Sequence, residues 1–273
     1  MPWIKKPGEP IPTTTVVAAV NFYNEYAQTQ VQFVPPVVTI SFEHEEQDTR
    51  VVDVHMDVTY NDTNFHLRSI KAEDHETVHT YLNSQDLVRR KYANKKTVSA
   101  EATKGRVETL AKRFDPAVTD GCFMHGGFYL SDNDTDEFLG MVNSGHTGKQ
   151  MLDPVTNQEK PEPYSEIGVL LGAYAWSHKP ENIVEEYPVP KPLKKEYSGV
   201  GTVGIWSLAQ YTRKLKEKNY TIKGQPIEEM RACGMIDNEG GWKAACKSGM
   251  KVWDISARED YGDELRYELR LKL

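Results

Sequence analysis

The sequence predicts a mixed α/β protein in which a mixed β-sheet is flanked by helices and preceded by a β-rich segment at the amino terminus. Two observations predict this fold class. Short runs of β-branched and aromatic residues alternate with a few longer amphipathic segments. From about residue 65, the expected order is strand, two helices, three strands, helix, strand, helix and two strands, which places helices on the faces of one sheet.

The composition is that of an ordinary globular protein. Its 273 residues suffice for one large domain, or for one domain with an extension. Hydrophobic residues make up 38% of the chain and charged residues 27%, which is typical of a protein that buries a core. The formal net charge of −7 and the pI near 5.7 argue against a general nucleic-acid or anionic-membrane binder.

Three features predict a cytoplasmic protein that binds no membrane. The opening residues, MPWIKKPGEPIP, lack the apolar core of a signal peptide. No apolar run approaches the roughly 20 residues that span a bilayer. Cys122, Cys233 and Cys246 are odd in number and lack metal-type spacing, so we expect free thiols in a reducing compartment.

Residues 1–64 are the expected amino-terminal extension. Two stretches in it, Val37–Phe42 and Val51–Tyr60, are β-like, and the charged residues between them are typical of a hairpin connection. Alternation places four apolar side chains of the second stretch on one face, namely Val52, Val54, Met56 and Val58. The extension ends in a polar turn cluster at Asn61–Asn64. The sequence leaves two roles open for it, added strands of the sheet or contacts within a homodimer.

Residues 65–273 are the expected main domain. A cap region at Thr97 and Ser99 opens its longer first-half helix, and a polar turn at 132–134 joins two of its strands. Residues 172–196 contain prolines and many charges, and we expect a long insertion there. The predicted strands are Phe65–Ile70, Cys122–Leu130, Glu137–Ser144, Tyr164–Leu171, Ile227–Met235, Met250–Ile255 and Glu264–Leu271, and the predicted helices are Glu73–Leu82, Thr97–Phe114, Ile205–Lys216 and Gly241–Lys247.

Glycines at 199, 201 and 204 form the motif GVGTVG directly before a predicted helix. Glycines let backbone N–H groups approach a phosphate, and the helix amino terminus adds partial positive charge. The same letters match the dinucleotide fingerprint, which should follow a buried strand and precede a strand that ends in an acid. Lys194–Ser198 is no buried strand, and the next predicted strand carries its acids, Glu228 and Glu229, at its beginning instead of its end. We therefore favour phosphate binding over a Rossmann site or a purely structural turn.

His75-Glu76-Thr77-Val78-His79 is a literal HExxH motif on a predicted helix. Histidines at i and i+4 share a face and can bind zinc, with Glu76 as general base. A catalytic zinc site needs a third protein ligand, and none is evident in the sequence. We expect two exposed histidines and no metal, and a zinc metallopeptidase is kept as an alternative.

A third segment, Asp237-Asn238 followed by Gly241–Met250, is typical of a loop asparagine, a short helix and a glycine stop before a strand. By itself it indicates an ordinary capped helix.

Taken together, these segments resemble the GNAT N-acetyltransferase superfamily, in the branch that includes ribosomal-protein amino-terminal acetyltransferases. The resemblance covers roughly residues 65–273 and rests on the order and spacing of five pieces. These pieces are Leu67-Arg68 with Glu73-Asp74, Phe138–Val142, Glu166–Gly168, Tyr197–Gly201 and Asn238–Met250. The resemblance implies the GNAT fold, with a central, mixed and mostly antiparallel sheet.

The resemblance further implies acetyl-CoA as acyl donor, a primary amine as acceptor and no metal. A neutral amine then attacks the thioester directly, which requires a base, an oxyanion donor and an acid. The acceptor itself, a protein amino terminus or a small-molecule amine, is not identified by the sequence. The implied cofactor contacts are Val169, Leu170 and Leu171 along the pantetheine arm, Gly199, Val200, Gly201, Thr202, Val203 and Gly204 at the pyrophosphate, and Asn238 and Lys247.

Some positions depart from the family pattern. Glu196 stands where Gln or Arg usually opens the pyrophosphate loop, and Ala245 stands where many relatives carry a tyrosine that acts as general acid. No acid can therefore be assigned. Glu166 is the candidate base, against a structural role, and His146 is a candidate on the substrate side, against a loop histidine. A non-catalytic acyl-CoA-binding module and a dinucleotide-binding oxidoreductase are the remaining alternatives.

Overall fold

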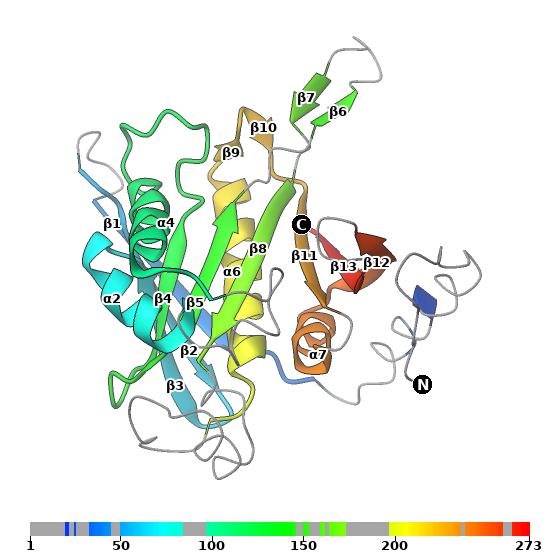
Figure 1. Cartoon of the computed structure of the whole chain (residues 1–273), viewed down its shortest axis with the longest axis horizontal. Helices are drawn as coiled ribbons and strands as arrows, with labels where there is room; N and C mark the ends of the chain where they lie inside the picture. Colours follow the sequence, from blue (N-terminus) through cyan, green and yellow to red (C-terminus); the bar gives the residue numbers. More distant parts are fainter. Residues whose placement is uncertain are drawn as a thin grey trace.

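A nine-stranded sheet forms the centre of the computed structural model (Figure 1). The strands follow the order β1-β2-β3-β4-β5-β8-β11-β13-β12. The structure describes residues 20, 21, 25, 33–44, 50–83, 97–145, 150–152, 159–161, 164–172, 197–235, 238–258 and 264–273.

The structure contains a strand or helix at each place where the sequence predicted one from residue 65 onward. The sheet contains β1 Val37–Glu43, β2 Asp53–Tyr60, β3 Thr63–Ser69, β4 Gly127–Asp132, β5 Phe138–Gly145, β8 Tyr164–Leu171, β11 Glu229–Met235, β12 Lys251–Arg258 and β13 Glu264–Lys272. Two small hairpins pair β6 Gln150–Leu152 with β7 Glu159–Pro161 and β9 Thr221–Ile222 with β10 Gln225–Pro226. The helices are α2 His75–Val78, α4 Ala100–Lys112, α6 Val200–Glu217 and α7 Glu239–Lys247, with a 3-10 turn η1 Ala72–Asp74 before α2 and a π-helical turn η2 His79–Asn83 after it.

Every neighbouring pair in the large sheet is antiparallel except β8 and β11, which are parallel. The prediction of a mixed, mostly antiparallel sheet flanked by helices is therefore confirmed. Among the described residues, no helix combines the length and apolar character that a membrane span requires.

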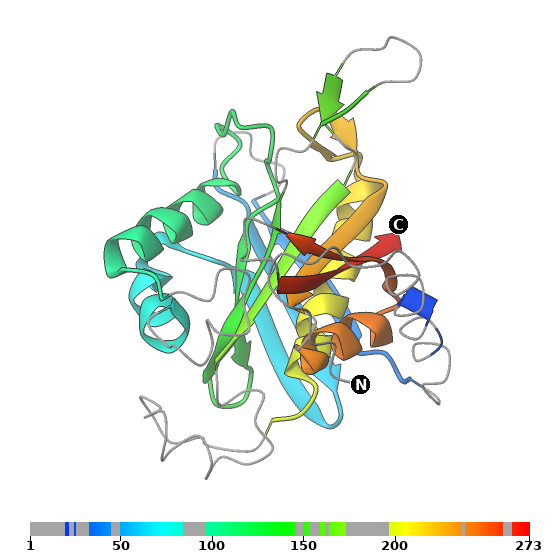
Figure 2. The same cartoon turned by 45° about the vertical axis from the view of Figure 1, so that its right-hand side comes forward.

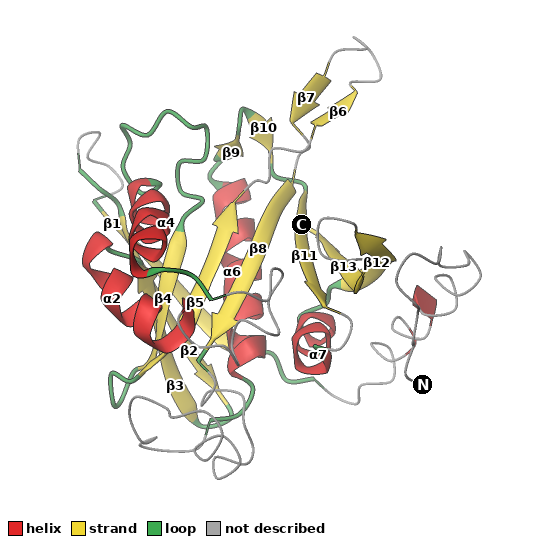
Figure 3. Ribbon diagram, viewed as in Figure 1, coloured by secondary structure: helices red, strands yellow, loops and turns green. Residues whose placement is uncertain are grey.

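Helices cover both faces of the sheet, as Figures 2 and 3 show. Beneath α2, η2 and α4 lies a small apolar cluster formed by Ile70, Val78, Leu82, Val107, Leu110, Phe138, Met141 and Leu170. The opposite face carries α6 and α7 over a much larger cluster, which includes Val54, Met56, Leu130, Val142, Val203, Leu208 and Trp242. The fold is thus a three-layer arrangement with the sheet in the middle.

The amino-terminal hairpin of β1 and β2 belongs to this same sheet and core. The alternation predicted for β2 is confirmed, because Val52, Val54, Met56 and Val58 are all buried. β2 pairs with β3, and the boundary expected between residues 64 and 65 falls inside β3. Asn61 and Asp62 join the two strands with φ of 48° and 58°, as a two-residue turn of the I′ type requires. The hairpin is therefore built into the fold.

A partly buried ion pair joins Arg68 of β3 to Asp74, just before α2. The Arg68 guanidinium donates to both carboxylate oxygens of Asp74, at 2.8 and 2.7 Å, and stacks on the Tyr129 ring at 4.2 Å. Asp74 also accepts from the Lys71 N–H at 2.7 Å. Bidentate pairing of this kind fixes geometry as well as adding energy, so the end of β3 and the turn before α2 are held together.

Two expected boundaries were wrong. The helix predicted from Ile205 begins five residues earlier, at Val200, so the glycine motif is the first turn of α6 and not a loop before it. The strand predicted from Cys122 begins only at Gly127, because residues 122–126 form a turn in which Met124 has φ of 66°. In addition, the single helix expected over Glu73–Leu82 is divided into η1, α2 and η2.

The close approach of α6 to the sheet depends on Gly204. A Cβ there would lie 2.9 Å from Val142 Cγ1 and 3.4 Å from Val169 Cγ1, and these two valines are paired across β5 and β8. Gly105, in the middle of α4, is exposed and has open space where a Cβ would stand. The two helical glycines therefore differ in what a methyl group would meet.

We expect Gly204→Ala to lower the free energy of unfolding by about 1–2 kcal/mol, since overpacking costs about 1–3 kcal/mol and the gain in helix propensity offsets about 1 kcal/mol. Gly105→Ala should instead raise it by about 1 kcal/mol, because only the propensity changes. Urea unfolding of both variants measures the difference. If both substitutions raised the free energy of unfolding, α6 would not be packed as tightly on β5 and β8 as described.

Candidate functional site

The parallel strands β8 and β11 separate partway along their length. Their ladder pairs Tyr164–Ile167 with Glu229–Ala232 and stops there, although β8 continues to Leu171 and β11 to Met235. On its other edge, β8 stays paired with β5 as far as Leu171. Within the described residues, β8 and β11 are therefore not paired with each other beyond Ile167 and Ala232. We call this interruption of the ladder, in the middle of the sheet, the gap.

The first turn of α6 lies beside this gap. Gly204 sits over Val169, and a Cβ on Gly201 would contact Leu171 Cδ1 at 3.7 Å and Ala244 Cβ of α7 at 3.5 Å. The helix start is thus placed between the end of β8 and α7 (Figure 1). The first N–H groups of a helix have no partner inside the helix, and the helix dipole places partial positive charge there.

The turn that leads into α6 is held by two tyrosines. Gly199, the residue before the helix, is left-handed with φ of 74°, and a Cβ on it would lie 2.5 Å from Tyr60 Cε1. The Tyr197 hydroxyl donates to Glu137 Oε2 at 2.9 Å, which ties the turn to the start of β5. Burial, together with the Glu137 hydrogen bond, raises the pKa of Tyr197 well above its usual range. Tyr197 therefore stays a neutral donor at physiological pH.

On the far side of the gap, Asn238 begins α7. Its side-chain oxygen accepts from the Gly241 N–H at 3.2 Å, so the capped helix expected from the sequence is confirmed. Lys247 stands in the last turn of the same helix, about 13 Å along the axis from Asn238 at 1.5 Å per residue. The structure therefore does not bring Asn238 and Lys247 to one point.

Glu166 stands on β8 one residue before the ladder ends. It is half-buried and lies between Gly145 of β5 and Arg231 of β11. Its neighbour Ile167 points into the core beneath α6, and side chains alternate along a strand. Glu166 therefore faces the opposite side of the sheet from α6. The Arg231 guanidinium on that side stacks on Tyr164 at 3.9 Å and pairs with Glu229 at 2.7 Å.

The structure brings most of the sequence-based candidates together. The segment Val169, Leu170 and Leu171 and the segment Gly199–Gly204 meet at the gap, with Asn238 on the neighbouring helix. His146 and Glu196 lie outside the described residues, as does nearly all of the expected insertion 172–196. Ala245 is buried, so its position offers no acid.

Sequence reasoning missed Tyr60 and Glu137. Tyr60 ends the alternating run of β2 on its apolar face, so the pattern indicated burial. Its contact with Gly199, far along the chain, depends on the order of the strands, which the pattern does not give. The partnership of Glu137 and Tyr197 was hidden for the same reason.

The histidines of the HExxH segment, His75 and His79, are half-buried, so the prediction of two exposed histidines was wrong. His75 Nδ1 is 2.9 Å from the Ala72 carbonyl oxygen, and His79 Nδ1 is 3.4 Å from Thr103 Oγ1. Among the described residues, no group of three or more His, Cys, Asp or Glu side chains is arranged to hold a metal ion. The metallopeptidase alternative therefore finds no support.

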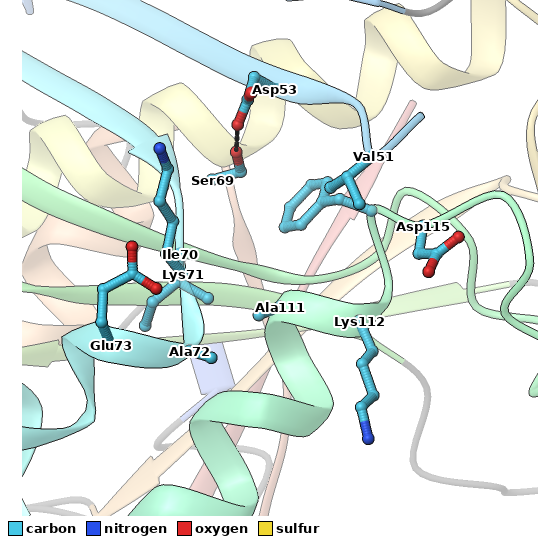
Figure 4. A pocket seen from close by; sticks show the side chains of 11 residues that line it. Val51, Asp53, Ser69, Ile70, Lys71, Ala72, Glu73, Ala111, Lys112 and Asp115 are labelled. Atoms are coloured by element: carbon cyan, nitrogen blue, oxygen red, sulfur yellow. Dashed lines mark hydrogen bonds between the residues drawn. The ribbon is translucent and has the colours of Figure 1, made fainter. Parts of the chain in front are cut away.

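A cavity of about 360 Å³ lies at the end of β3, away from the gap (Figure 4). Its lining includes Val51, which precedes β2, Asp53 in β2 and Ser69 in β3. Lys112, the last residue of α4, and Phe114 just after it also line the cavity. β4 and β5 separate β3 from β8. None of the sequence-based site residues lines this cavity.

Comparison with known proteins identifies the fold. No family model and no curated protein matches the sequence. Among solved structures, RimL, the ribosomal L7/L12 α-N-protein acetyltransferase in complex with coenzyme A, matches with a TM-score of 0.50, 11% identity and coverage of 80% of this chain and 98% of its own. The aminoglycoside acetyltransferase AAC(6')-Ib in complex with ribostamycin and coenzyme A matches with a TM-score of 0.50, 12% identity and coverage of 76% and 92%.

A GNAT-family acetyltransferase from Bacillus anthracis also matches, with a TM-score of 0.46, 16% identity and coverage of 76% of this chain and 94% of its own. The fold is that of the GNAT acetyltransferases, as the sequence predicted.

The cap of α7 gives a direct test of the helix beside the gap. Asn238→Ala should lower the free energy of unfolding by about 1 kcal/mol, because the Gly241 N–H loses the side-chain oxygen and keeps only the Asn238 carbonyl as acceptor, whereas Asn238→Asp should keep most of the stability. Asn133→Ala, at an exposed turn between β4 and β5, is the control and should change little. Urea unfolding compares the three variants, and equal stability of Asn238→Ala and Asn133→Ala would contradict the cap.

Proposed function

We propose that this protein is an acetyl-CoA-dependent N-acetyltransferase that transfers the acetyl group to a primary amine. The observation that carries the proposal is the end of the ladder between β8 and β11 at Ile167 and Ala232, beside which the first turn of α6 lies. In support, RimL and AAC(6')-Ib share the fold and are described with coenzyme A bound.

Two parts of coenzyme A, the pantetheine arm and the pyrophosphate, fit backbone groups at the gap. The pantetheine arm contains amide groups, which can pair with the backbone of β8 beyond its ladder with β11, at Val169, Leu170 and Leu171, as an added strand would. The pyrophosphate is an anion, which suits the N–H groups of the first turn of α6 at 200–204. Asn238 would contact the arm from α7, and Lys247 would lie farther along that helix. When bound, the cofactor supplies an activated thioester.

The chain's own acid–base chemistry is assigned to Glu166. An amine must be neutral to attack the thioester, so a carboxylate at the gap would take the ammonium proton, directly or through a water. Glu166 stands where the ladder ends and faces away from α6. An acceptor would then approach from the sheet face opposite the phosphate site. His146 is kept as a candidate on that side.

The acceptor is proposed to be a cationic amine, either a protein amino terminus or a small molecule. The net charge of −7 favours the approach of cations through long-range steering. The free thiols of Cys122, Cys233 and Cys246 suit a reducing compartment, in keeping with a cytoplasmic enzyme. The alternative is a non-catalytic acyl-CoA-binding module, which would bind the cofactor without turnover on any amine.

Isothermal titration of the purified protein with acetyl-CoA and desulfo-CoA tests the cofactor site. We expect micromolar binding that Gly201→Asp weakens by at least about 100-fold, because the new carboxylate occupies the anion site and repels the phosphates. An acid in the first turn suits the helix dipole, so the fold should persist.

Gly105→Asp makes the same charge change on α4 and should leave binding within about twofold of wild type. Absence of binding at millimolar ligand would overturn the proposed function. Equal weakening by both aspartates would mean that net charge, and not the start of α6, controls affinity.

Glu166→Gln tests the base. With the best acceptor from a panel of peptide amino termini, polyamines, amino acids and aminoglycosides, kcat near neutral pH should fall by about 100-fold. Affinity for acetyl-CoA should stay within about twofold, because the Glu166 side chain is not among the proposed cofactor contacts. Thiol release measures turnover, and titration measures affinity. An unchanged kcat would assign Glu166 a purely structural role.

A further inference from the structure

Tyr60 connects the amino-terminal hairpin to the start of α6. It is the last residue of β2 and is paired with Thr63 across the Asn61-Asp62 turn. Both turn residues have positive φ, so the hairpin end is a tight, defined turn. Tyr60 lies on the same face of β2 as the buried Val58, which directs its ring toward α6.

The contact between Tyr60 and Gly199 is too close to admit a side chain. A Cβ on Gly199 would stand 2.5 Å from Cε1 and 3.2 Å from Cδ1 of the Tyr60 ring. The edge of the ring therefore rests against the backbone of the residue that precedes α6. Because that residue is left-handed, its conformation sets the direction in which the first N–H groups of the helix point.

A second restraint acts on the other side of the same turn. The Tyr197 hydroxyl donates to Glu137 at 2.9 Å, and Tyr197 itself is buried. Tyr197 fixes the chain before Gly199, and Tyr60 covers Gly199 itself. The left-handed turn is thus held between β5 and β2, two strands that lie on opposite sides of β3 and β4.

We infer that Tyr60 is a positioning residue for phosphate binding, through which the amino-terminal hairpin forms part of the cofactor site. The inference rests on the proposed function for the identity of the ligand, and on the contact with Gly199 for the mechanism. By packing on Gly199, the ring keeps the first turn of α6 formed before the ligand arrives. Preorganisation of this kind lowers the ordering cost of binding.

The hairpin offers a matched control in Phe42. Its ring also packs on α6, but against Tyr211 in the third turn, with ring centroids 6.1 Å apart. Phe42→Ala therefore removes an aromatic ring from the same hairpin and the same helix, away from Gly199. Tyr60→Phe keeps the ring and removes only the hydroxyl.

Amide hydrogen exchange without ligand measures the positioning directly. The first amides of α6 that have a helical acceptor are those of Val203 and Gly204, and Val203 donates to Gly199 itself. Tyr60→Ala should speed exchange at these two amides by about tenfold relative to the rest of α6, whereas Tyr60→Phe and Phe42→Ala should leave them as in wild type. Titration with CoA should show about tenfold weaker binding for Tyr60→Ala and at most about twofold change for the other two variants.

The two readouts separate the possible failures. If wild type binds CoA but Tyr60→Ala changes neither exchange nor affinity, the positioning role is wrong. It is equally wrong if Phe42→Ala weakens binding as much as Tyr60→Ala, because the hairpin would then act only through general stability. If exchange at Val203 and Gly204 responds as expected but wild type binds no CoA, the proposed function fails while Tyr60 still positions the turn.

Discussion

The packing of α6 on the paired Val142 and Val169 is the contact on which the rest of the structure depends. Gly204 allows it, because any side chain there would hold the helix away from β5 and β8. At this depth, the start of α6 reaches the place where β8 and β11 part. The end of a strand ladder and a helix amino terminus are both common features. The packing of α6 on these valines places the two next to each other, and this arrangement defines the candidate site.

The three glycines of the GVGTVG motif have three different physical tasks. Gly199 adopts a left-handed conformation under the Tyr60 ring, and Gly201 faces α7 and the end of β8. Gly204 lacks a side chain and so lets α6 pack closely on the sheet. In a dinucleotide-binding fold the same spacing follows a buried strand and serves a tight turn at its end. In this protein the sequence before the motif is not that of a buried strand. Tyr197, two residues before Gly199, is instead held by a side-chain hydrogen bond to Glu137. Equal spacing of glycines therefore does not imply equal geometry.

Much of the fold could be predicted because its patterns are local. The alternation in β2 and the cap at Asn238 depend on neighbouring residues, and both are confirmed. The start of α6 was missed because glycine is a poor helix former, and packing against the sheet and α7 overrides that preference. The contact of Tyr60 with Gly199 joins residues distant in sequence, so no local signal contains it. The segments that form the candidate site could therefore be predicted from the sequence. The contacts that hold these segments in place could not.

The position of the gap also bears on how two substrates could meet. α6 lies on one face of the sheet, and Glu166 points to the other. A ligand held at the start of α6 and along β8 would thus place its reactive end at the gap between β8 and β11, between the two faces of the sheet. An amine could reach that point from the side of Glu166 without displacing the cofactor. Direct transfer requires such simultaneous access, and a continuous ladder between β8 and β11 would close it. The ending of that ladder at Ile167 and Ala232 is therefore the structural condition for the proposed chemistry.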